Sequence, residues 1–334
     1  MEGVAGLTWS DRTVLITGAG GMVGSWVTKR LLGEGAHVVA LVPVHEPRSE
    51  FARAGLAARV TVVVGGLEDV AAVGRAVLGN GVDTVFHLGA QTVVGAAYQD
   101  PVANFEANIR GTYLLLDACR RSSGAVERVV VASSDKAYGA SATLPYTEQM
   151  PLHGVQPYEV SKSCTDLLAQ SYAATYNLPV AIARCGNIYG GGDLNWSRIV
   201  PGTIRAVLRG DKPVIRSDGT LVRDYLHVDD AVAAYLTLAD WLDLGASDDE
   251  AKGGIGFNFS EERPRTVLEV YDAVCAALGK RVEPTIRGEA SSEIHDQHLD
   301  ASRAHEVLGW SSSVDLESGL ARTVDWYRHL LSER

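Results

Sequence analysis

A tyrosine and a lysine four residues apart, Tyr158 and Lys162, are the side chains of this sequence best suited to acid–base chemistry. Residues spaced in this way lie on one face of a helix. The ammonium would lower the pKa of the phenol and could also hold the ribose of a nicotinamide cofactor. The tyrosinate would then accept a proton from a substrate hydroxyl while hydride leaves the carbon atom. Chance would give about 0.2 such pairs in this chain, so the spacing favours catalysis over an exposed helix pair.

A glycine-rich turn near the start of the chain predicts a dinucleotide site. The apolar run Val14–Thr17 leads into Gly18-Ala19-Gly20-Gly21-Met22-Val23-Gly24, and a helical pattern follows. Glycines at 18, 21 and 24 permit a tight turn, close approach to a pyrophosphate and close helix–strand packing. The helix N-terminus adds N–H groups for the phosphates. The expected cofactor contacts here are Gly18, Gly21, Met22, Val23 and Gly24.

The end of the second predicted strand bears on the choice of cofactor. The segment Leu41–Arg48 has no acid at the strand end to hold the adenosine ribose of NAD. Arg48 would either meet a 2′-phosphate or lie in solvent. NAD is the expected cofactor, and NADP is left open.

Strand and helix patterns alternate through the first half of the chain. The strands are expected at Thr13–Thr17, His37–Val42, Val60–Val64, Thr84–Leu88, Arg128–Ser133 and Val180–Arg184. The helices are expected at Met22–Leu32, Val70–Leu78, Pro101–Ser122 and Tyr158–Tyr176. This alternation predicts an α/β fold with a Rossmann-type, doubly wound parallel sheet, with the chemistry at its carboxyl edge.

The pattern becomes less regular after Gly190, which predicts a smaller C-terminal lobe that binds the substrate. We expect residues 1–185 to form the NAD(P)-binding domain and residues 186–334 the lobe, with some chain returning to the first domain. The charged stretch Gly245–Gly254 is expected to be an exposed loop. Helices are expected at Ala231–Leu242, Thr266–Leu278, Ser302–Leu308 and Leu316–Leu331.

Composition limits the compartment and the partners. The net charge of −11 argues against a nucleic-acid partner, because such binding depends on Lys and Arg at phosphates. No stretch approaches the roughly 20 apolar residues of a membrane span, and Met1–Arg12 lacks the pattern of a secretory signal. His87 and His227 have no partners at metal-ligand spacing and are expected to serve packing. We therefore expect a cytoplasmic protein without a metal or a membrane contact, with reduced thiols at Cys119, Cys164, Cys185 and Cys275.

Together these motifs resemble the extended short-chain dehydrogenase/reductase family, in its NAD-dependent epimerase/dehydratase group. The similarity covers nearly the whole chain: Thr17–Gly24, His87–Gln91, Asn108, Ser133-Ser134, Tyr158/Lys162, Arg184–Asn187 and Arg223–Tyr225. The resemblance implies further cofactor contacts at Leu67, Leu88 and Ala90. One departure is Gly66, where the family usually has an Asp that touches the adenine amino group.

The segment Ser134-Asp135-Lys136 indicates which reaction of the group to expect. A 4-epimerase needs only a hydroxyl here to orient the sugar. A 4,6-dehydratase also needs an acid to protonate the departing C6 hydroxyl and a base to remove the C5 proton, and Asp135 and Lys136 supply both types. The segment is similar to the Ser/Thr-Asp-Lys pattern of CDP-glucose 4,6-dehydratases, whereas the dTDP-glucose enzymes have Glu in place of the Lys.

The resemblance also implies a nucleotide-diphosphate sugar as substrate, with Ser134 at its O4 and further contacts from Gln91, Asn187, Arg198 and Arg223. Arginine's planar fork suits phosphate oxygens. The nucleotide base and the hexose stay open. Apolar positions on more than one face of Pro101–Ser122 and Tyr158–Tyr176 predict a homodimer, which family members often form through these helices.

Two other functions remain open at this point. A nucleotide-sugar 4-epimerase would use the same Tyr158/Lys162 oxidation but rotate the keto sugar before reducing it again. A cofactor-binding regulator would keep the fold and lose turnover, and the intact Tyr158/Lys162 pair argues against this class.

Overall fold

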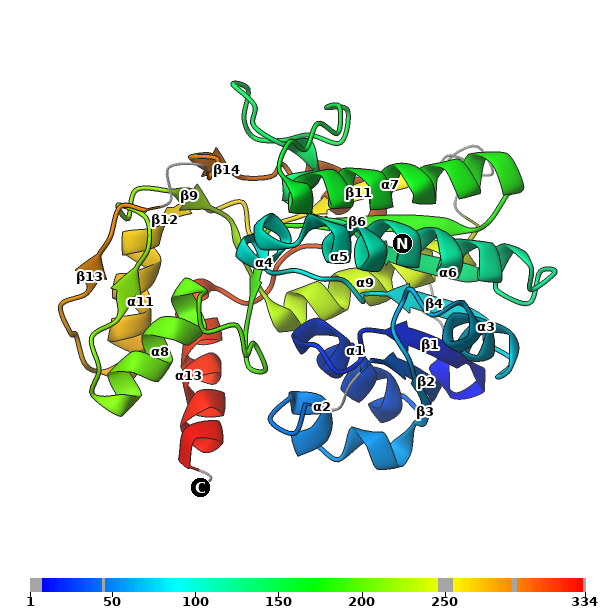
Figure 1. Ribbon diagram of the computed structural model, residues 1–334, viewed down its shortest axis with the longest axis horizontal. Coiled ribbons are helices and arrows are strands. Elements are labelled where there is room, and N and C mark those ends of the chain that lie inside the picture. The colour runs from blue at the N-terminus through cyan, green and yellow to red at the C-terminus, as the bar shows by residue number, and fades with distance from the viewer. Residues whose placement is uncertain (1–7, 44–45, 246–254, 290–292, 333–334) are drawn as a thin grey trace.

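The computed structural model describes residues 8–43, 46–245, 255–289 and 293–332. Its main feature is a seven-stranded parallel sheet in the order β11-β6-β5-β4-β1-β2-β3 (Figure 1). The strands are β1 Thr13–Thr17, β2 His37–Val42, β3 Thr61–Val64, β4 Thr84–His87, β5 Arg128–Ala132, β6 Val180–Cys185 and β11 Ile255–Phe259. The predicted doubly wound sheet is confirmed, and the six predicted strands agree with the structure to within one residue at each end.

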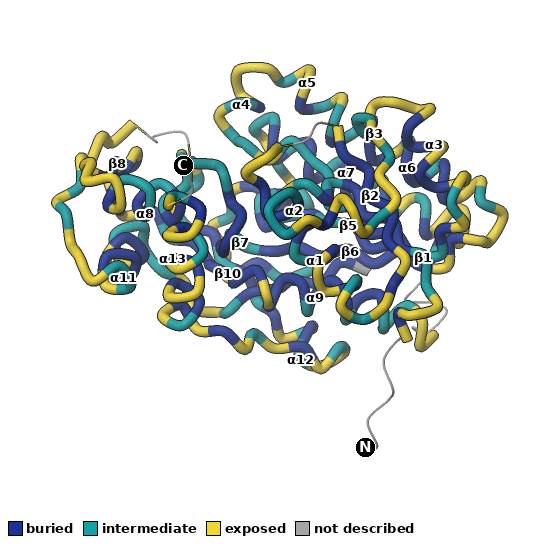
Figure 2. The backbone as a smooth tube through the Cα atoms, turned by 90° about the horizontal axis from the view of Figure 1, so that it is seen from below, coloured by how far each residue is buried: buried dark blue, intermediate teal, exposed yellow. Residues whose placement is uncertain are grey.

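Alternate residues of each strand pack against opposite layers of helices. Val14 and Ile16 of β1 belong to the core beneath helices α1 Met22–Gly33 and α9 Val228–Asp243. Leu15 belongs to the core on the other face, beneath α3 Val70–Leu78, α6 Gly111–Arg120 and α7 Pro157–Tyr176. Figure 2 shows the inner strands buried between the two layers, as expected for apolar strands covered on both faces, whereas the edge strand β3 is mostly exposed.

The seventh strand, β11, was not predicted. It comes from the second half of the chain and pairs in parallel with β6. Gly256 interrupts its apolar pattern, and glycine is depleted in strands. The glycine is required there because a Cβ at this position would lie 2.5 Å from Cζ of Arg184.

The helix expected at Pro101–Ser122 is instead three consecutive pieces: α5 Pro101–Phe105, a π-helical turn Glu106–Arg110, and α6. Single π turns inside α-helices are frequent at functional sites. The backbone carbonyl of Asn108, in the turn, accepts hydrogen bonds from the hydroxyls of Thr112 and Thr165, at 2.5 and 3.1 Å. The Asn108 side chain donates to Ser161 of α7 at 2.9 Å and to the Gln91 carbonyl at 3.0 Å.

The second half of the chain forms a group of shorter elements beside the sheet's carboxyl edge (Figure 1). The predicted helices here are confirmed, although α9 begins three residues before the expected Ala231 because the His227 ring caps its N-terminus at Asp229 N, 3.2 Å away. Gly245 ends the helical region, and the rest of the expected Gly245–Gly254 loop lies outside the described residues. The elements are β7 Asn187–Tyr189, α8 Ile199–Arg209, β8 Val214–Ile215, β9 Val222–Arg223, β10 Tyr225–His227, β12 Arg265–Thr266, α11 Val267–Leu278, β13 Thr285–Ile286, β14 Asp296–Gln297, α12 Ser302–Leu308 and α13 Leu316–Ser332. Short helices α2 Glu50–Arg53 and α4 Val94–Gln99 complete the first half, with 3-10 turns at Trp9–Asp11, Leu56–Arg59 and Asp135–Tyr138.

A buried ion pair fixes α7 to the sheet. Arg184 of β6 donates to both carboxylate oxygens of Asp166 on α7, at 2.8 and 2.9 Å, and the side chains are 5% and 0% exposed. The Arg184 guanidinium also donates to the Tyr138 hydroxyl at 2.9 Å. The pair therefore links α7, which carries Tyr158 and Lys162, to the segment that follows β5.

We expect Asp166→Ala to lower the free energy of unfolding by about 3–5 kcal/mol, because it leaves the Arg184 charge buried without its partner. Asp117→Ala is the matched control, since Asp117 pairs with Arg120 at 2.7 Å on the exposed surface and should cost less than about 1 kcal/mol. Urea unfolding followed by circular dichroism measures both. Equal losses in the two variants would contradict the assignment.

Candidate active site

A single pocket of about 810 Å³ runs along the carboxyl edge of the sheet and between the two halves of the chain. Doubly wound sheets bind ligands at this edge, where the strand order reverses, here between β1 and β4. The pocket wall includes every predicted site residue except Asp135. These are Gly18, Gly21, Met22, Val23, Gly24, Leu67, Leu88, Ala90, Gln91, Ser134, Lys136, Tyr158, Lys162, Asn187, Arg198 and Arg223.

The glycine turn after β1 has the geometry of a pyrophosphate cradle. Gly18 has φ +70°, and a Cβ there would lie 2.7 Å from Cα of Gly89. A Cβ at Gly24 would lie 2.2 Å from the Gly18 carbonyl oxygen. Gly21 caps α1, so the free N–H groups of the helix point at the space above the turn. The cradle requires glycine for steric reasons, and the residues present fit a dinucleotide.

Gly66 stands where the family usually has an Asp, and the side chain of Glu68 lies in the space that such an Asp would occupy. Glu68 also lines the pocket, and a Cβ at Gly66 would lie only 2.2–2.5 Å from the Glu68 carboxylate. The acid two residues further along the chain therefore occupies the space of the missing side chain. Sequence reasoning did not place Glu68 in the site, although its position beside Gly66 was a usable signal.

Tyr158 and Lys162 lie one turn apart on α7, and both are buried. Lys162 Nζ donates to the Ala132 carbonyl at 2.8 Å, and burial lowers the pKa of Lys162 to about 8. Burial raises the pKa of Tyr158 to about 12, and the positive charge of Arg198 opposes that rise. At Tyr158 the loss of water contact therefore outweighs nearby positive charge, and the expected action of Lys162 on the phenol stays a prediction.

Of the three residues Ser134–Lys136 after β5, two line the pocket and one does not. Ser134 and Lys136 line the pocket, whereas Asp135 is buried outside its wall. Successive residues of a 3-10 turn point about 120° apart, so consecutive side chains cannot share one direction. Asp135 still contacts the site through Ser134, whose hydroxyl donates to Asp135 Oδ1 at 2.8 Å. Among the described residues, Oδ2 of Asp135 has no hydrogen-bond partner.

Lys136 is half-buried, and it lines the pocket wall. Its Nζ donates to Oε1 of Gln297 on β14 at 2.6 Å. Burial lowers the pKa of Lys136, the charge of Asp135 opposes this change, and the charge of Arg223 adds to it. A lowered pKa increases the fraction of neutral amine at neutral pH, which is the form that can accept a proton.

The candidate substrate-binding residues differ in how many hydrogen bonds their side chains already make within the protein. Gln91 is already engaged, since its Oε1 accepts from Asn104 at 3.0 Å and its Nε2 donates to Val93 O at 3.2 Å. The Arg223 guanidinium donates to three backbone carbonyls, at 2.7–2.8 Å. Asn187 lines the pocket from β7.

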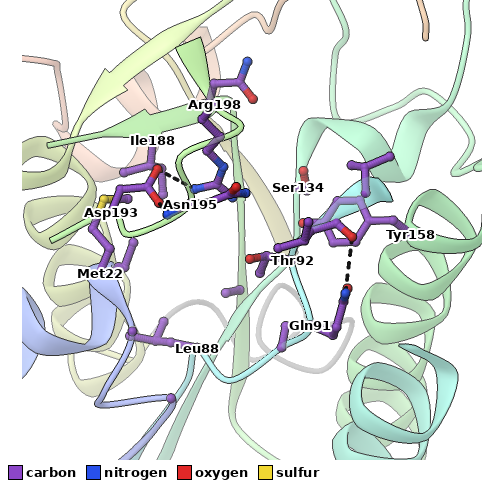
Figure 3. A pocket seen from close by; sticks show the side chains of 18 of the residues that line it. Met22, Leu88, Gln91, Thr92, Ser134, Tyr158, Ile188, Asp193, Asn195 and Arg198 are labelled. Carbon is purple, nitrogen blue, oxygen red and sulfur yellow. Dashed lines mark hydrogen bonds and ion pairs between the residues drawn. The ribbon is translucent and has the colours of Figure 1, made fainter. Parts of the chain in front are cut away.

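Arg198 is the more available cation for phosphate oxygens. Its Nη1 pairs with Asp193 at 3.0 Å, and its side chain is 40% exposed. Figure 3 shows the Asp193–Arg198 pair on one side of the pocket, with Ser134 and Tyr158 on the other. Asp193 was not predicted as a site residue, and its neighbours Gly190–Gly192 were the only signal for it.

The two histidines serve structure, as expected. The His87 ring lies between the hydroxyls of Thr17 at 2.9 Å and Thr112 at 3.0 Å, and burial lowers its pKa to about 3. His227 caps α9. Within the described residues, no cluster of three His, Cys, Asp or Glu side chains could hold a metal ion.

Comparison with known proteins gives one family. A family model described as the NAD dependent epimerase/dehydratase family matches residues 14–251. A UDP-glucose 4-epimerase of Mycolicibacterium smegmatis is 30% identical, over 94% of this chain and 98% of that one. A CDP-glucose 4,6-dehydratase of Salmonella typhimurium is 29% identical, over 96% and 91%. The structure of a dTDP-glucose 4,6-dehydratase from Streptomyces venezuelae, solved with NAD bound, has a TM-score of 0.82 at 27% identity, with 94% and 96% covered.

The chain spans about half the length of two trifunctional UDP-glucose 4,6-dehydratases of Arabidopsis thaliana, with which it shares 28% identity over 96% of its own length. None of the described helices is both long and apolar enough to cross a membrane.

We expect Gly24→Ala to weaken NAD binding, because the added Cβ would force the Gly18 turn open. Overpacking of this kind costs about 1–3 kcal/mol, or roughly 5- to 150-fold in the dissociation constant. Gly33→Ala, at the other end of α1, is the control, since a Cβ there meets nothing within 4 Å. Titration calorimetry with NAD measures both, and unchanged affinity in Gly24→Ala would rule out the cradle.

Proposed function

The chain belongs to the NAD-dependent epimerase/dehydratase family, and from this we propose that it is a nucleotide-sugar 4,6-dehydratase, converting an NDP-hexose to an NDP-4-keto-6-deoxyhexose. The observation that carries the proposal is Lys136. A half-buried lysine at the wall of the pocket, in the segment that leaves β5, with its pKa lowered by loss of water contact, suits proton abstraction from C5. Oxidation at C4 alone would not require it.

The residues of the site divide the reaction between them. NAD, when bound, supplies a reversible hydride acceptor for C4 and later returns the hydride to C6. Tyr158 accepts the O4 proton, Lys162 orients the cofactor ribose, and Ser134 hydrogen-bonds O4. The C4 ketone acidifies C5–H, neutral Lys136 takes that proton, and Asp135 supplies a proton to the departing O6. Protonated Lys136 returns a proton to C5 as the hydride reaches C6, and the proton taken up by Tyr158 offsets the one given by Asp135, so one water is lost and the cycle is redox-neutral.

The second candidate is a nucleotide-sugar 4-epimerase. The position of Asp135 favours it, because the expected acid of elimination lies behind Ser134 and not on the pocket wall. An epimerase would use only Tyr158, Lys162 and Ser134, all of which line the pocket.

For the substrate we propose a nucleoside diphosphate sugar whose diphosphate meets Arg198 and Asn187. We also propose that residues 1–185 bind the cofactor and that most of 186–334 binds the sugar nucleotide, with β11 returning to the sheet. The four cysteines are all free, which fits the reducing cytoplasm.

The elimination step, which only a dehydratase carries out, can be tested separately from the oxidation at C4. We expect Lys136→Met and Asp135→Asn to accumulate reduced nicotinamide with substrate while overall turnover falls about 10²–10⁴-fold, the usual value of one positioned proton-transfer group. In deuterated water the wild type should place deuterium at C5, at a rate that rises with pH through the pKa of Lys136, since only the neutral amine is a base. Tyr158→Phe, which blocks C4 oxidation, is the control that should show neither signal. A product of unchanged mass with no deuterium at C5 would establish the epimerase instead.

A homodimer is the proposed assembly, formed by α6 and α7. Apolar side chains remain exposed on these helices, among them Leu167 at 53%, Tyr176 at 51% and Tyr113 at 38%. Contiguous exposed apolar surface of this kind marks interfaces.

We expect Leu167→Glu to convert the dimer to a monomer, because it would place two charges at an apolar interface. Light scattering at micromolar concentration measures the mass, and Leu208→Glu is the control, since Leu208 is exposed at 38% on α8. A wild-type protein that is already monomeric would count against the proposed assembly.

A further inference from the structure

A buried amide in the second half of the chain lies at the end of the Lys136 side chain. Gln297 is 0% exposed, and its Oε1 is 2.6 Å from Lys136 Nζ. An ammonium can only donate hydrogen bonds, so the amide atom that faces protonated Lys136 is the oxygen. We propose that Gln297 is a positioning residue for Lys136, which holds the amine at the pocket wall and, being uncharged, leaves it free to lose its proton. The proposal rests on the proposed function, in which Lys136 is the base of elimination.

Gln297 is itself held in place from three directions. It lies on β14, which pairs in parallel with β9 and sets Gln297 opposite Arg223. The next residues are tied to other segments: Tyr146 N donates to the His298 carbonyl at 2.9 Å, and Leu299 N donates to Asp224 Oδ2 at 2.6 Å. The backbone at Gln297 is therefore fixed, which places its side-chain amide beside Lys136, although the amide Nε2 has no hydrogen-bond partner among the described residues.

The backbone that carries Lys136 is equally constrained. Its N–H donates to Ser134 Oγ at 3.2 Å, and its carbonyl accepts from Gly139 N at 3.2 Å. Gly139 has φ +68°, and a Cβ there would lie 2.1 Å from the His153 carbonyl oxygen. With both ends fixed, the hydrogen bond to Gln297 decides where the flexible lysine side chain places its amine.

The charge of residue 297 then decides how readily the amine loses its proton. The acids Asp135, Glu293 and Glu159 act on Lys136 in favour of the ammonium, whereas burial and the charge of Arg223 oppose it. An amide oxygen accepts a hydrogen bond from either form and adds no full charge. A carboxylate at the same distance would favour the ammonium and remove the base. Gln297 on β14 and Arg223 on β9 pair directly, so the partner of the base and a candidate phosphate contact lie on adjacent strands.

The test compares two substitutions by the pH profile of deuterium uptake at C5. Gln297→Glu keeps the size and the acceptor but adds a charge, so we expect the profile to move up by about 1–3 pH units. The uptake at pH 7 should fall tenfold for each unit. Gln297→Met keeps the volume and removes the oxygen acceptor. We expect about a 10²-fold slower uptake, as for other misplaced catalytic groups, without an upward shift and with unchanged KM.

Two further measurements separate the outcomes. C4 oxidation, followed by nicotinamide absorbance in a single turnover, should be unchanged in both variants because it does not use Lys136. Gln149→Glu, at an exposed position, controls for added charge and should follow the wild-type profile. If Gln297→Glu does not fold, Gln297→Met alone decides, and unchanged C5 uptake in it would overturn the proposal.

Failure of this inference differs from failure of the proposed function. If Lys136→Met abolishes C5 uptake while Gln297→Glu keeps the wild-type pH profile, Gln297 has no positioning role and the dehydratase stands. If Lys136→Met takes up deuterium like the wild type, Lys136 is not the base and the proposed function itself is wrong.

Discussion

Burial of ionisable side chains at one edge of the sheet is the constraint on which the rest of the site depends. Tyr158, Lys162 and Lys136 all lie where water is largely excluded, and burial disfavours the charged form of each. Each of the two amines donates a hydrogen bond to one acceptor, which offsets part of the cost of burial. The acceptor is the Ala132 carbonyl for Lys162 and the side-chain amide oxygen of Gln297 for Lys136. A phenol with a pKa of about 12 stays protonated at neutral pH.

The fold keeps these groups in register by connecting elements that are distant in the sequence. The π-helical turn at Asn108 connects the loop after β4 to α7, through Gln91 on one side and Ser161 on the other. The Arg184–Asp166 pair connects the same helix to β6 and, through Tyr138, to the segment after β5. Both faces of α7 are thus anchored by buried polar contacts, and such contacts are costly to break when one partner is lost.

Much of the architecture could be predicted from the sequence, because strands buried on both faces read as continuous apolar runs and the glycine turn has a steric cause. Every predicted site residue but one lines a single pocket. The failures have physical causes as well. Gly256 interrupts the apolar pattern that would have indicated β11. The π-helical turn at Asn108 accepts a hydrogen bond from the Thr165 hydroxyl of α7, a contact that the local sequence does not reveal. The direction of Asp135 could not be read from its place beside Lys136, since adjacent side chains on a 3-10 turn diverge. The hydrogen-bond partner of Lys136 could not be predicted from the sequence either, because Gln297 is 161 residues away along the chain.

Overall similarity does not choose between the two candidate reactions, because an epimerase and a dehydratase match this chain at 30% and 29% identity. Both reactions begin with oxidation at C4, and the residues for that step are common to both. The choice therefore depends on groups that only elimination needs. Burying an amine has a free-energy cost, and one acceptor offsets only part of it. An epimerase gains nothing from placing Lys136 on the pocket wall, where an apolar side chain would cost less. A dehydratase does gain, because the burial that makes the lysine costly also lowers its pKa, and the neutral amine is the form that can remove a proton from C5.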